Sequence, residues 1–264
     1  MSSFTLKMIA IIAMLIDHIG LAIDNHTMRI IGRLAFPIFA FQLVIGYKYT
    51  KNLKKFIGRL LLFAIISEVP FFIFLRMNKL NQIGFTEFFL LENNIGKNAM
   101  FAGRENFNIL FTMLFAIVAI IVFESKIDLF TVKKNKINLL FFWFVKLLII
   151  VSLCLIADCL GFDYGALGVM LILLLHIAAK VPQRLPICMV TAIFAITNYF
   201  LNFKKILGPY TTNEVFLLTL FTFLPAILMI RYNGKKGYSM KYFFYIFYPL
   251  HITIIILLKY FSVI

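Results

Sequence analysis

Long apolar stretches recur from one end of this sequence to the other. Each runs for about 20 residues, the length that a helix needs to cross the hydrocarbon core of a bilayer. In lipid the backbone N–H and C=O groups must be satisfied within the segment, so such stretches fold as helices. We therefore predict an all-α fold, a polytopic transmembrane helical bundle with about nine spans. The nine candidate spans are 5–23, 28–47, 56–75, 107–123, 139–157, 164–180, 187–203, 214–230 and 242–262.

The composition agrees with a chain whose solvent is lipid. Of the 264 residues, 62% are hydrophobic and only 14% are charged, against roughly 45–50% and about 25% in soluble domains. This balance excludes a soluble enzyme, a disordered tail and a disulfide scaffold. The three cysteines match no metal-binding spacing, so we expect no metal site. The first apolar run contains Asp17 and His18 and is too long for a signal peptide, so we expect it to remain as the first span.

The net charge of +15 predicts the orientation of the chain in the membrane. Lys and Arg accumulate in short cytoplasmic loops, and they are more numerous on the inner side when the N-terminus is placed inside. We therefore expect a cytoplasmic N-terminus, an outer C-terminus and a multi-pass protein of the bacterial cell membrane. The partner that explains the charge is the lipid bilayer, and we expect no nucleic acid.

No internal repeat and no break in composition divides the sequence, so we expect residues 1–264 to form a single domain. Its longest connection is an outer loop at 76–106. Phe85, Phe88 and Phe89 lie in this loop among Asn, Gly and Glu residues. The pattern suits a short interfacial helix or a lid over an outward cavity, and it equally suits a solvated loop.

Three ionisable side chains lie at similar depth in the first three spans. His18, Arg33 and Glu68 are each about 8–10 Å inside the outer ends of their helices, at 1.5 Å per residue. Ionisable groups are costly in hydrocarbon and face a bundle interior or a wet cavity. We therefore expect a base, a cation and an acid in one chamber that opens to the outer side.

A structural explanation stays open for each of these residues. A single intramembrane histidine can simply be hydrogen-bonded between helices, and Arg33 and Glu68 can form a structural ion pair. Asp17 is about 100° from His18 around the helix, which makes it a poor partner for that ring. We expect Glu68 or Asp163, on another helix, to orient His18 instead.

Further polar residues can join this layer. Asn108 and Thr112 begin the fourth span, and Asp163 and Tyr164 begin the sixth. His251 lies deeper, although a kink at Pro249 is a structural reason for a polar side chain there. The candidates for substrate or cofactor binding are Asp17, Arg29, Asn108, Asp163, Tyr164, His251, Lys7 and Lys48.

The chemistry of the layer suits acyl transfer. A neutral imidazole held at one nitrogen is a competent general base near neutral pH, and a guanidinium can stabilise a developing oxyanion. The same groups would also suit proton relay in a transporter or flippase, which is the alternative function. A structural component of a secretion or pilus system is a third class, and it would leave the polar layer without a purpose.

Several stretches, with their polar residues in place, resemble the TraX family of integral-membrane acetyltransferases. They cover most of the chain in the order of the family. The resemblance implies an acetyltransferase of the kind named for acetylating the N-terminus of pilin, distantly similar to the acyltransferase-3 group. The stretches are LKMIAIIAMLIDHIG, RIIGRLAFPIFAFQLVIGYKYT, RLLLFAIISEVPF, NILFTMLFAIVAI, DYGALGVMLILLL and FYIFYPLHI.

The resemblance also implies roles for particular residues. His18 would be the catalytic base or a transient acyl carrier, with Arg33 and Glu68 beside it. The donor would be acetyl-CoA from the cytoplasm, with its phosphates near Lys48 and related lysines. Lys7 stands where the wider group has arginine. Lysine cannot make the bidentate phosphate contact that arginine makes. The acceptor would be an amine or hydroxyl of a peptide N-terminus or surface glycan on the outer side, and the long loop is a departure from typical members.

Overall fold

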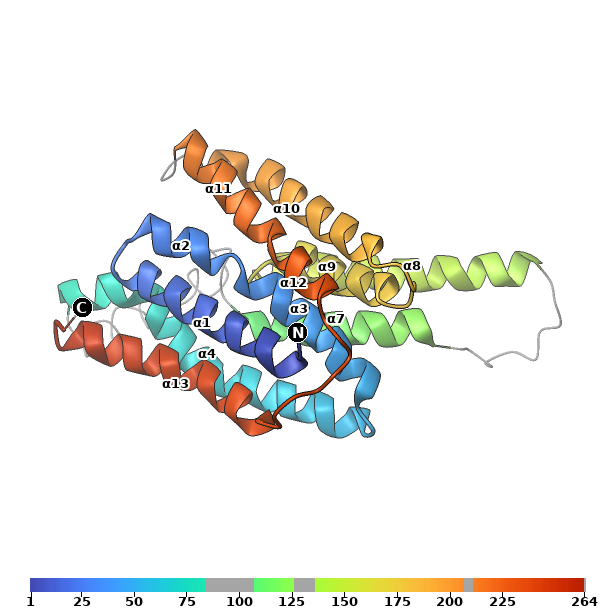
Figure 1. Cartoon of the computed structure of the whole chain (residues 1–264), viewed down its shortest axis with the longest axis horizontal. Helices are drawn as coiled ribbons and strands as arrows, with labels where there is room; N and C mark the ends of the chain where they lie inside the picture. The colour runs from blue at the N-terminus through green and yellow to red at the C-terminus, as the bar shows by residue number, and fades with distance from the viewer. Residues whose placement is uncertain (84–106, 126–135, 207–210, 264) are drawn as a thin grey trace.

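The structure, a computed structural model, describes residues 1–83, 107–125, 136–206 and 211–263. These residues form helices and no strand, with an isolated bridge between Phe107 and Phe162. The all-α prediction is confirmed for the described part of the chain (Figure 1). The helices are α1 (Ser3–Ala22), α2 (His26–Gly32), α3 (Ala35–Tyr49), α4 (Leu53–Ile83), α7 (Ile109–Glu124), α8 (Lys136–Cys159), α9 (Gly165–Ala178), α10 (Leu185–Ile206), α11 (Thr212–Phe223), α12 (Pro225–Ile230) and α13 (Lys241–Tyr260).

Six of the helical segments are long and apolar enough to cross a membrane. Three further apolar helices are shorter, and together the nine segments correspond to the nine predicted stretches. The membrane-protein class is therefore supported, while nine complete spans remain a prediction. The six are Ser3–Ala22, His26–Tyr49, Leu53–Arg76, Leu140–Cys159, Thr212–Ile230 and Tyr242–Tyr260, and the three shorter ones are Ile109–Glu124, Gly165–Ala178 and Leu185–Tyr199.

Two of the expected continuous spans are each broken into a pair of helices. The span predicted at 28–47 is α2 followed by α3, and the break falls at Arg33. Proline explains it, because Pro37 has no N–H to donate and its ring clashes with the carbonyl group four residues earlier, that of Arg33. Pro225 likewise separates α11 from α12. The first break matters for the site, because it places Arg33 at a helix end.

The loop predicted at 76–106 begins later than expected. Helix α4 continues to Ile83 and contains Pro70 without ending there. The apolar run stops near Arg76, but the helix does not, because the residues that follow include good helix formers such as Met, Lys and Leu. The rest of the predicted loop, including the interfacial helix or lid, lies outside the described residues.

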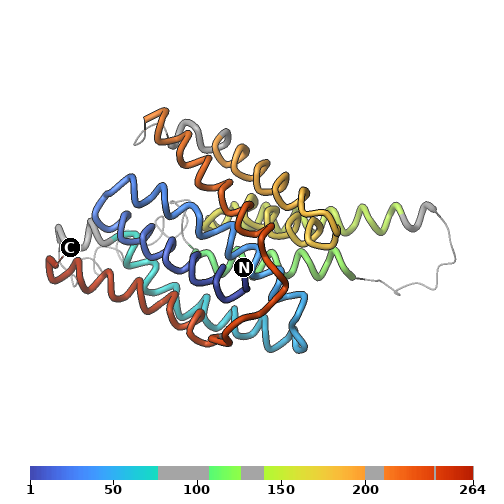
Figure 2. Tube along the Cα trace, viewed as in Figure 1, coloured from blue at the N-terminus to red at the C-terminus, as the bar shows by residue number. Residues whose placement is uncertain are grey.

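The helices bury their apolar faces in two clusters. The larger cluster joins α1, α3, α7 and α9, with Leu6, Ile38, Ile117 and Ile172 among its most buried members. The smaller cluster joins α1, α4 and α13, which lie side by side in Figures 1 and 2. Helix α1 contributes to both clusters. The smaller cluster consists of Ala22, Phe71, Phe74, Tyr248, Ile252 and Ile255.

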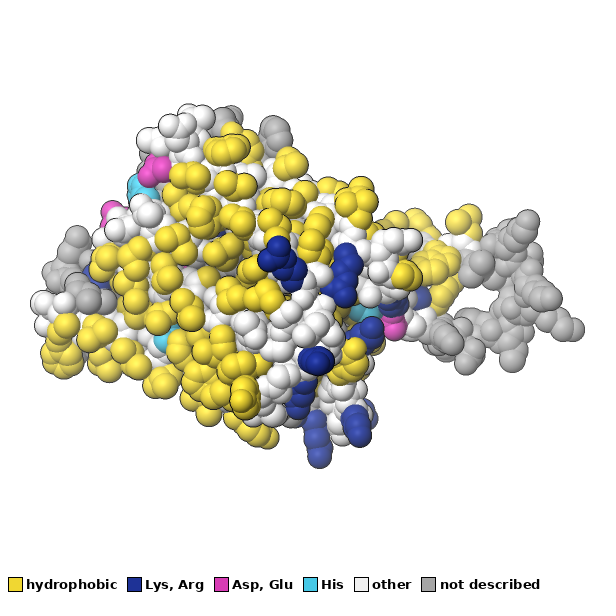
Figure 3. Space-filling view, viewed as in Figure 1, with side chains coloured by type: hydrophobic (Ala, Val, Ile, Leu, Met, Phe, Trp, Pro, Cys, Tyr) yellow, Lys and Arg dark blue, Asp and Glu magenta, His cyan; other side chains and the backbone are white. Residues whose placement is uncertain are grey.

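One end of the bundle gathers basic residues, and we call it the basic end. The amino group of Met1 donates to the carbonyl oxygen of Arg231 at 2.6 Å, and the N–H of Ser3 donates to that of Lys235 at 2.9 Å. These bonds tie the start of α1 to the segment between α12 and α13. Figure 3 shows Lys and Arg side chains near this end, while apolar side chains cover most of the same face. The basic end carries Lys48, Lys51, Lys54, Lys55, Arg184, Arg231, Lys235 and Lys236.

This segregation is compatible with the predicted orientation. Lys and Arg mark the cytoplasmic side of membrane proteins, so the basic end is expected to face the cytoplasm. The apolar surface between the two ends would face lipid; Leu140 of α8, for example, is 73% exposed. The side of the membrane on which each terminus lies stays a prediction.

Candidate active site

A cavity of about 290 Å³ lies near the end of α1 that is remote from the basic end. It is situated where the smaller hydrophobic cluster meets the segment that precedes α9. Binding sites for small molecules combine apolar walls with a few convergent polar groups, and this cavity has both. Its apolar residues are Leu21, Phe71, Phe74 and Leu75, and its polar residues are Asp17, His18, Arg29, Arg33, Asp163 and Tyr164.

Asp17 of α1 is held between two arginines. Nη1 of Arg29 donates to its Oδ2, and Nη2 of Arg33 donates to its Oδ1, both at 2.7 Å. Nε of Arg33 also donates to the carbonyl oxygen of Arg29 at 3.1 Å. Arg29 and Arg33 are four residues apart across the end of α2, so they reach the same carboxylate. Arg33, which the sequence predicted in a layer with His18 and Glu68, is therefore paired with Asp17.

The close approach of α1 and α2 depends on Gly32. A Cβ atom at Gly32 would lie 2.2 Å from the Cβ of Asp17, which no real pair of atoms tolerates. The glycine therefore leaves the space in which the Asp17 side chain reaches both guanidinium groups. Asn25 starts α2 by accepting from the N–H of Met28 at 3.0 Å, which completes the tight turn after α1.

Tyr164 reaches the cavity from an unusual backbone conformation. Its φ of 60° and ψ of −5° lie in the left-handed region, where a non-glycine residue is uncommon. The ring stacks on Phe36, with centroids 4.0 Å apart and planes inclined by 15°. The hydroxyl oxygen accepts a hydrogen bond from Nη1 of Arg33 at 3.3 Å. Such strain is often found at functional sites, where surrounding contacts maintain it.

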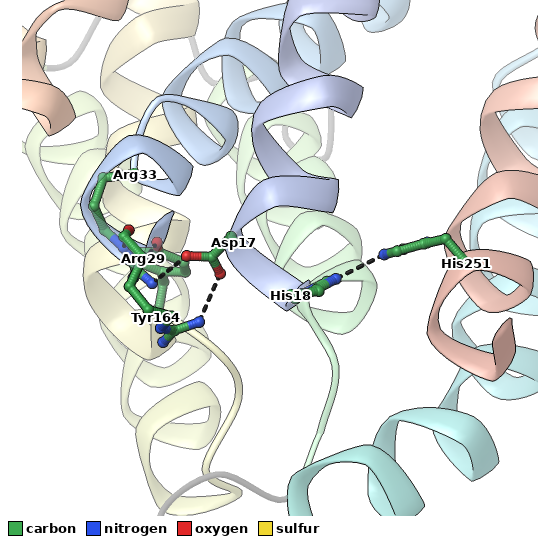
Figure 4. A network of polar contacts seen from close by, with 6 residues as sticks. All are labelled: Asp17, His18, Arg29, Arg33, Tyr164 and His251. Carbon is green, nitrogen blue, oxygen red and sulfur yellow. Dashed lines mark hydrogen bonds and ion pairs between the residues drawn. The ribbon is translucent and has the colours of Figure 1, made fainter. Parts of the chain in front are cut away.

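His18 points away from Asp17 and toward α13, as Figure 4 shows. Its Nδ1 lies 2.6 Å from Nε2 of His251. Nδ1 of His251 lies 2.7 Å from the carbonyl oxygen of Phe247. The edge of the Phe74 ring packs against His18, with centroids 5.3 Å apart. The predicted carboxylate partner of His18 is thus replaced by a second imidazole.

These two bonds determine the tautomers of the neutral rings. A carbonyl oxygen only accepts, so Nδ1 of His251 must carry its hydrogen and Nε2 must hold a lone pair. Nδ1 of His18 then donates to that lone pair. Consequently Nε2 of neutral His18 holds a lone pair, and among the described residues no hydrogen-bond donor reaches it. This free nitrogen is a candidate proton acceptor.

Glu68 lies elsewhere, which corrects the expected three-residue layer. Its Oε2 accepts from the backbone N–H of Asn108 at 3.1 Å and from Nδ2 of Asn108 at 2.6 Å. Nδ2 also donates to the carbonyl oxygen of Ala64 at 2.8 Å, and Oδ1 caps α7 by accepting from Leu110 N–H at 3.0 Å. Neither Glu68 nor Asn108 lines the cavity. Together they connect α4 to the start of α7. The structural alternative, an Arg33–Glu68 ion pair, does not hold, because Arg33 pairs with Asp17.

The remaining predicted residues divide between the two ends. Asp163 lines the cavity, and its backbone is fixed on both sides: the carbonyl oxygen accepts from Oγ1 of Thr112 at 2.5 Å, and the N–H donates to Phe107 at 3.1 Å. Lys7 lies toward the basic end, with its Nζ 5.1 Å from the centroid of the Phe244 ring. Lys48 is exposed at the end of α3. The two lysines do not line the cavity.

A second polar cluster lies near the basic end, and none of its residues lines the cavity. Nε2 of His176 in α9 is 2.9 Å from Oε1 of Glu124 at the end of α7, and Lys180 contacts the same oxygen. The Tyr47 ring meets His176 edge-on at 5.5 Å. We call Glu124, His176 and Lys180 the basic-end cluster. Groups of three or more His, Cys, Asp or Glu residues suited to a metal ion are not found in the described part of the chain.

The sequence did not predict the apolar residues that line the cavity or the pairing of Asp17 with two arginines. The apolar residues Leu21, Phe71, Phe74 and Leu75 carry no distinctive sequence signal, because aromatic and aliphatic residues occur throughout the spans. The pairing of Asp17 could have been found, since two arginines four residues apart follow soon after it and flank Gly32.

Taken together, these features define a class: a polytopic helical membrane protein with a polar cavity inside its bundle. The sequence matches the TraX protein family over residues 2–259. The chain therefore belongs to the TraX family.

Two relatives are similar along most of their length. The "Probable fimbrial assembly protein FimC, serogroup H1" of Dichelobacter nodosus is 29% identical over 264 aligned positions, which cover 96% of this chain and 94% of the relative. The "Uncharacterized protein RP591" of Rickettsia prowazekii (strain Madrid E) is 26% identical over 242 positions, covering 89% and 79%. No solved structure matches this chain significantly.

Proposed function

We propose that this protein is a membrane-embedded acetyltransferase that moves an acetyl group from acetyl-CoA to an amine or hydroxyl acceptor. The observation that carries the proposal is the free Nε2 of His18 in a cavity shared with two arginines. A lone pair at this nitrogen can accept a proton, and the guanidinium groups lie where an oxyanion would benefit from positive charge.

The His18 imidazole would act as general base. Its Nε2 removes the proton from the acceptor as the acceptor's nitrogen or oxygen attacks the thioester carbon. The imidazolium that results keeps its hydrogen bond from Nδ1 to His251, and this bond becomes charge-assisted and stronger. A neutral histidine thus takes the place of the more common carboxylate partner.

Arg29, Arg33 and the apolar lining would supply the electrostatic setting. Asp17 and Asp163, which also lines the cavity, balance the two positive charges, so stabilisation of an oxyanion would depend on the local placement of the guanidinium groups. Phe71 and Phe74 exclude water from one part of the cavity, and electrostatic interactions are stronger where water is excluded.

The donor would arrive from the basic end. Lys7 and His18 are eleven residues apart on α1, or about 16 Å along the helix at 1.5 Å per residue. Cationic groups there, including Lys48 and Lys235, suit the phosphates of acetyl-CoA. The extended arm of the donor would pass between helices to bring its thioester to His18.

The acceptor would be extracytoplasmic, and the protein would lie in the bacterial cytoplasmic membrane with its basic end inside. The relative from Dichelobacter nodosus is described as a probable fimbrial assembly protein. By analogy we propose a peptide N-terminus as the first acceptor to examine, with a surface glycan as the alternative.

The test uses purified full-length protein in detergent or nanodiscs, with labelled acetyl-CoA and release of free CoA as the readout. His18→Asn is the informative variant, because its side-chain amide can replace the Nδ1 donor toward His251 while the Nε2 lone pair is lost. We expect transfer to fall by about 10²–10⁴-fold, the usual effect of losing a general base.

His176→Asn is the matched control, since it makes the same change in a histidine of the basic-end cluster. It should leave transfer unchanged. Full transfer by His18→Asn would remove His18 from catalysis. Movement of protons or solutes across vesicles without consumption of thioester would favour a transporter instead.

A further inference from the structure

The hydroxyl group of Tyr164 has one hydrogen bond in place and one hydrogen to spare. Nη1 of Arg33 lies 3.3 Å from this oxygen, and a guanidinium can only donate. The tyrosine oxygen must therefore accept this bond, and its own hydrogen points elsewhere. Within the described residues no acceptor for that hydrogen is found, and the residue lines the cavity.

The position of this hydroxyl is well determined. The ring is stacked on Phe36, and its backbone is held in a left-handed conformation at the start of α9. The N–H of Gly168 donates to the carbonyl oxygen of Tyr164 at 2.9 Å. A donor that is fixed before the reaction needs no reorganisation when charge develops, which is the basis of oxyanion stabilisation.

Arg33, by contrast, is engaged at every nitrogen. Nε donates to the Arg29 carbonyl oxygen, Nη2 to Asp17 and Nη1 to Tyr164. These bonds use three of its five N–H groups, and the one toward Tyr164 brings the positive charge directly to the hydroxyl oxygen. A hydroxyl group that accepts from a cation is a better donor at its own hydrogen, because bonds in a chain polarise one another.

We propose that Tyr164 is a catalytic residue that donates a hydrogen bond to the thioester carbonyl oxygen as this oxygen becomes an oxyanion, and that Arg33 is the residue that positions and polarises it. The inference rests on the proposed acetyltransferase function and extends it. It changes the role of Arg33, whose guanidinium group was predicted from the sequence to stabilise the oxyanion.

The step is balanced without any further reactant. The nitrogen or oxygen of the acceptor forms a bond to the carbonyl carbon, and the acceptor's proton passes to Nε2 of His18. At the same time the π electron pair of the carbonyl group moves to its oxygen. Tyr164 keeps its proton and stabilises the oxyanion. When the carbonyl re-forms, the carbon–sulfur bond breaks, and the CoA thiolate leaves with the proton that His18 returns. The products are the acetylated acceptor and CoA.

The first test is Tyr164→Phe, which removes the hydroxyl and keeps the ring on Phe36. Loss of one oxyanion donor lowers kcat by about 10²–10³-fold, and we expect KM for acetyl-CoA to change little. Tyr47→Phe is the matched control, because this tyrosine packs on His176 near the basic end. It should keep the kcat of the unchanged protein.

A second measurement separates chemistry from structure and does not depend on how well the phenylalanine variant folds. Fluorotyrosines of increasing acidity, placed at position 164 by suppression of a stop codon, keep the ring and the hydroxyl. A donor to an oxyanion predicts that kcat changes systematically with the acidity of the phenol, whereas a structural tyrosine predicts a constant kcat.

The outcomes are distinguishable. The role of Tyr164 alone would be overturned if the unchanged protein is active and the Tyr164→Phe variant is equally active. The same conclusion would follow if kcat does not depend on the acidity of the phenol. Absence of acetyl transfer by the unchanged protein would overturn the proposed function, and this inference with it.

Discussion

The molecule contains two histidine clusters, one at each end of the bundle, and they differ in what satisfies the imidazole. At the basic end His176 meets a carboxylate, Glu124, that also contacts Lys180. At the cavity His18 meets a second imidazole, and its other nitrogen is left without a partner in the described residues. Both histidines lie near helix ends in apolar surroundings, so their sequence contexts are alike.

The comparison shows that the hydrogen-bond partner of a histidine distinguishes a structural imidazole from one that can take part in a reaction. A histidine between a carboxylate and an aromatic edge is satisfied as a structural element. A histidine whose hydrogen is donated to a neutral ring, with a lone pair left over in a cavity, can still perform chemistry. The contrast yields predictions in which the cavity end should respond strongly and the basic end weakly.

The largest effect is expected from His251→Leu. Without an acceptor for Nδ1, His18 can adopt the other tautomer, which places the hydrogen on Nε2 and removes the base. We expect the rate of CoA release to fall by about 10²–10⁴-fold. His251→Gln, whose amide oxygen can accept the same bond, should restore part of the rate, and an equal rate in the Leu variant would contradict the assigned tautomers.

Asp17→Asn should have the next largest effect, this time on stability. It removes the carboxylate that pairs with two part-buried guanidinium groups, and breaking such a pair costs about 3 kcal/mol. Thermal unfolding of the purified protein, followed by circular dichroism in detergent, measures the loss. A variant as stable as the unchanged protein would show that solvent already screens these charges.

Gly32→Ala should have a moderate effect. The added methyl group meets the Asp17 side chain at a distance that forces α1 and α2 apart, and overpacking of this kind costs about 1–3 kcal/mol. Both the unfolding temperature and the rate of transfer should fall. Gly58→Ala is the control, because a Cβ there meets nothing within 4 Å. Equal behaviour of the two variants would mean that the helix contact readily relaxes.

Glu124→Gln should have the smallest effect. Lys180 is half exposed, with 52% of its side chain accessible, and exposed ion pairs contribute about 0–1 kcal/mol. We expect a small change in unfolding temperature and an unchanged rate of acetyl transfer. A loss of transfer comparable to that of the His251 variant would show that the basic-end cluster also serves the reaction.

Much of the fold could be predicted from the sequence, because lipid imposes helices on apolar stretches of this length. All nine stretches are helical in the structure. The breaks in the second and eighth stretches were not predicted, although Pro37 and Pro225 are visible in the sequence. A proline inside an apolar run can kink a helix or divide it, and Pro70 and Pro249 do remain inside helices. Tertiary packing decides between these outcomes.

The polar residues that line the cavity could be predicted from the sequence, but their hydrogen-bond partners could not. Depth along the helices placed His18 and Arg33 at one level, and both line the cavity. Depth says nothing about direction around the bundle, however, and Glu68 faces the start of α7 instead. The partners of His18 and Asp17 depend on which helices are neighbours, and that is set by packing over the whole bundle.

The backbone of Tyr164 has a consequence for how natural variation at this position should be judged. A left-handed conformation costs a non-glycine residue about 1–2 kcal/mol, and the stacked ring returns about 0.5–1.5 kcal/mol. Glycine would avoid this cost, but it would lose both the stacking and the burial of a ring that packs against the larger hydrophobic cluster, and loss of a large buried aromatic side chain costs about 3–5 kcal/mol. A homologue with glycine at this position would therefore melt at a lower temperature. A homologue with phenylalanine would keep the stacked ring and melt at a similar temperature, yet it would lack the hydroxyl, and a screen for heat tolerance alone would not detect that loss.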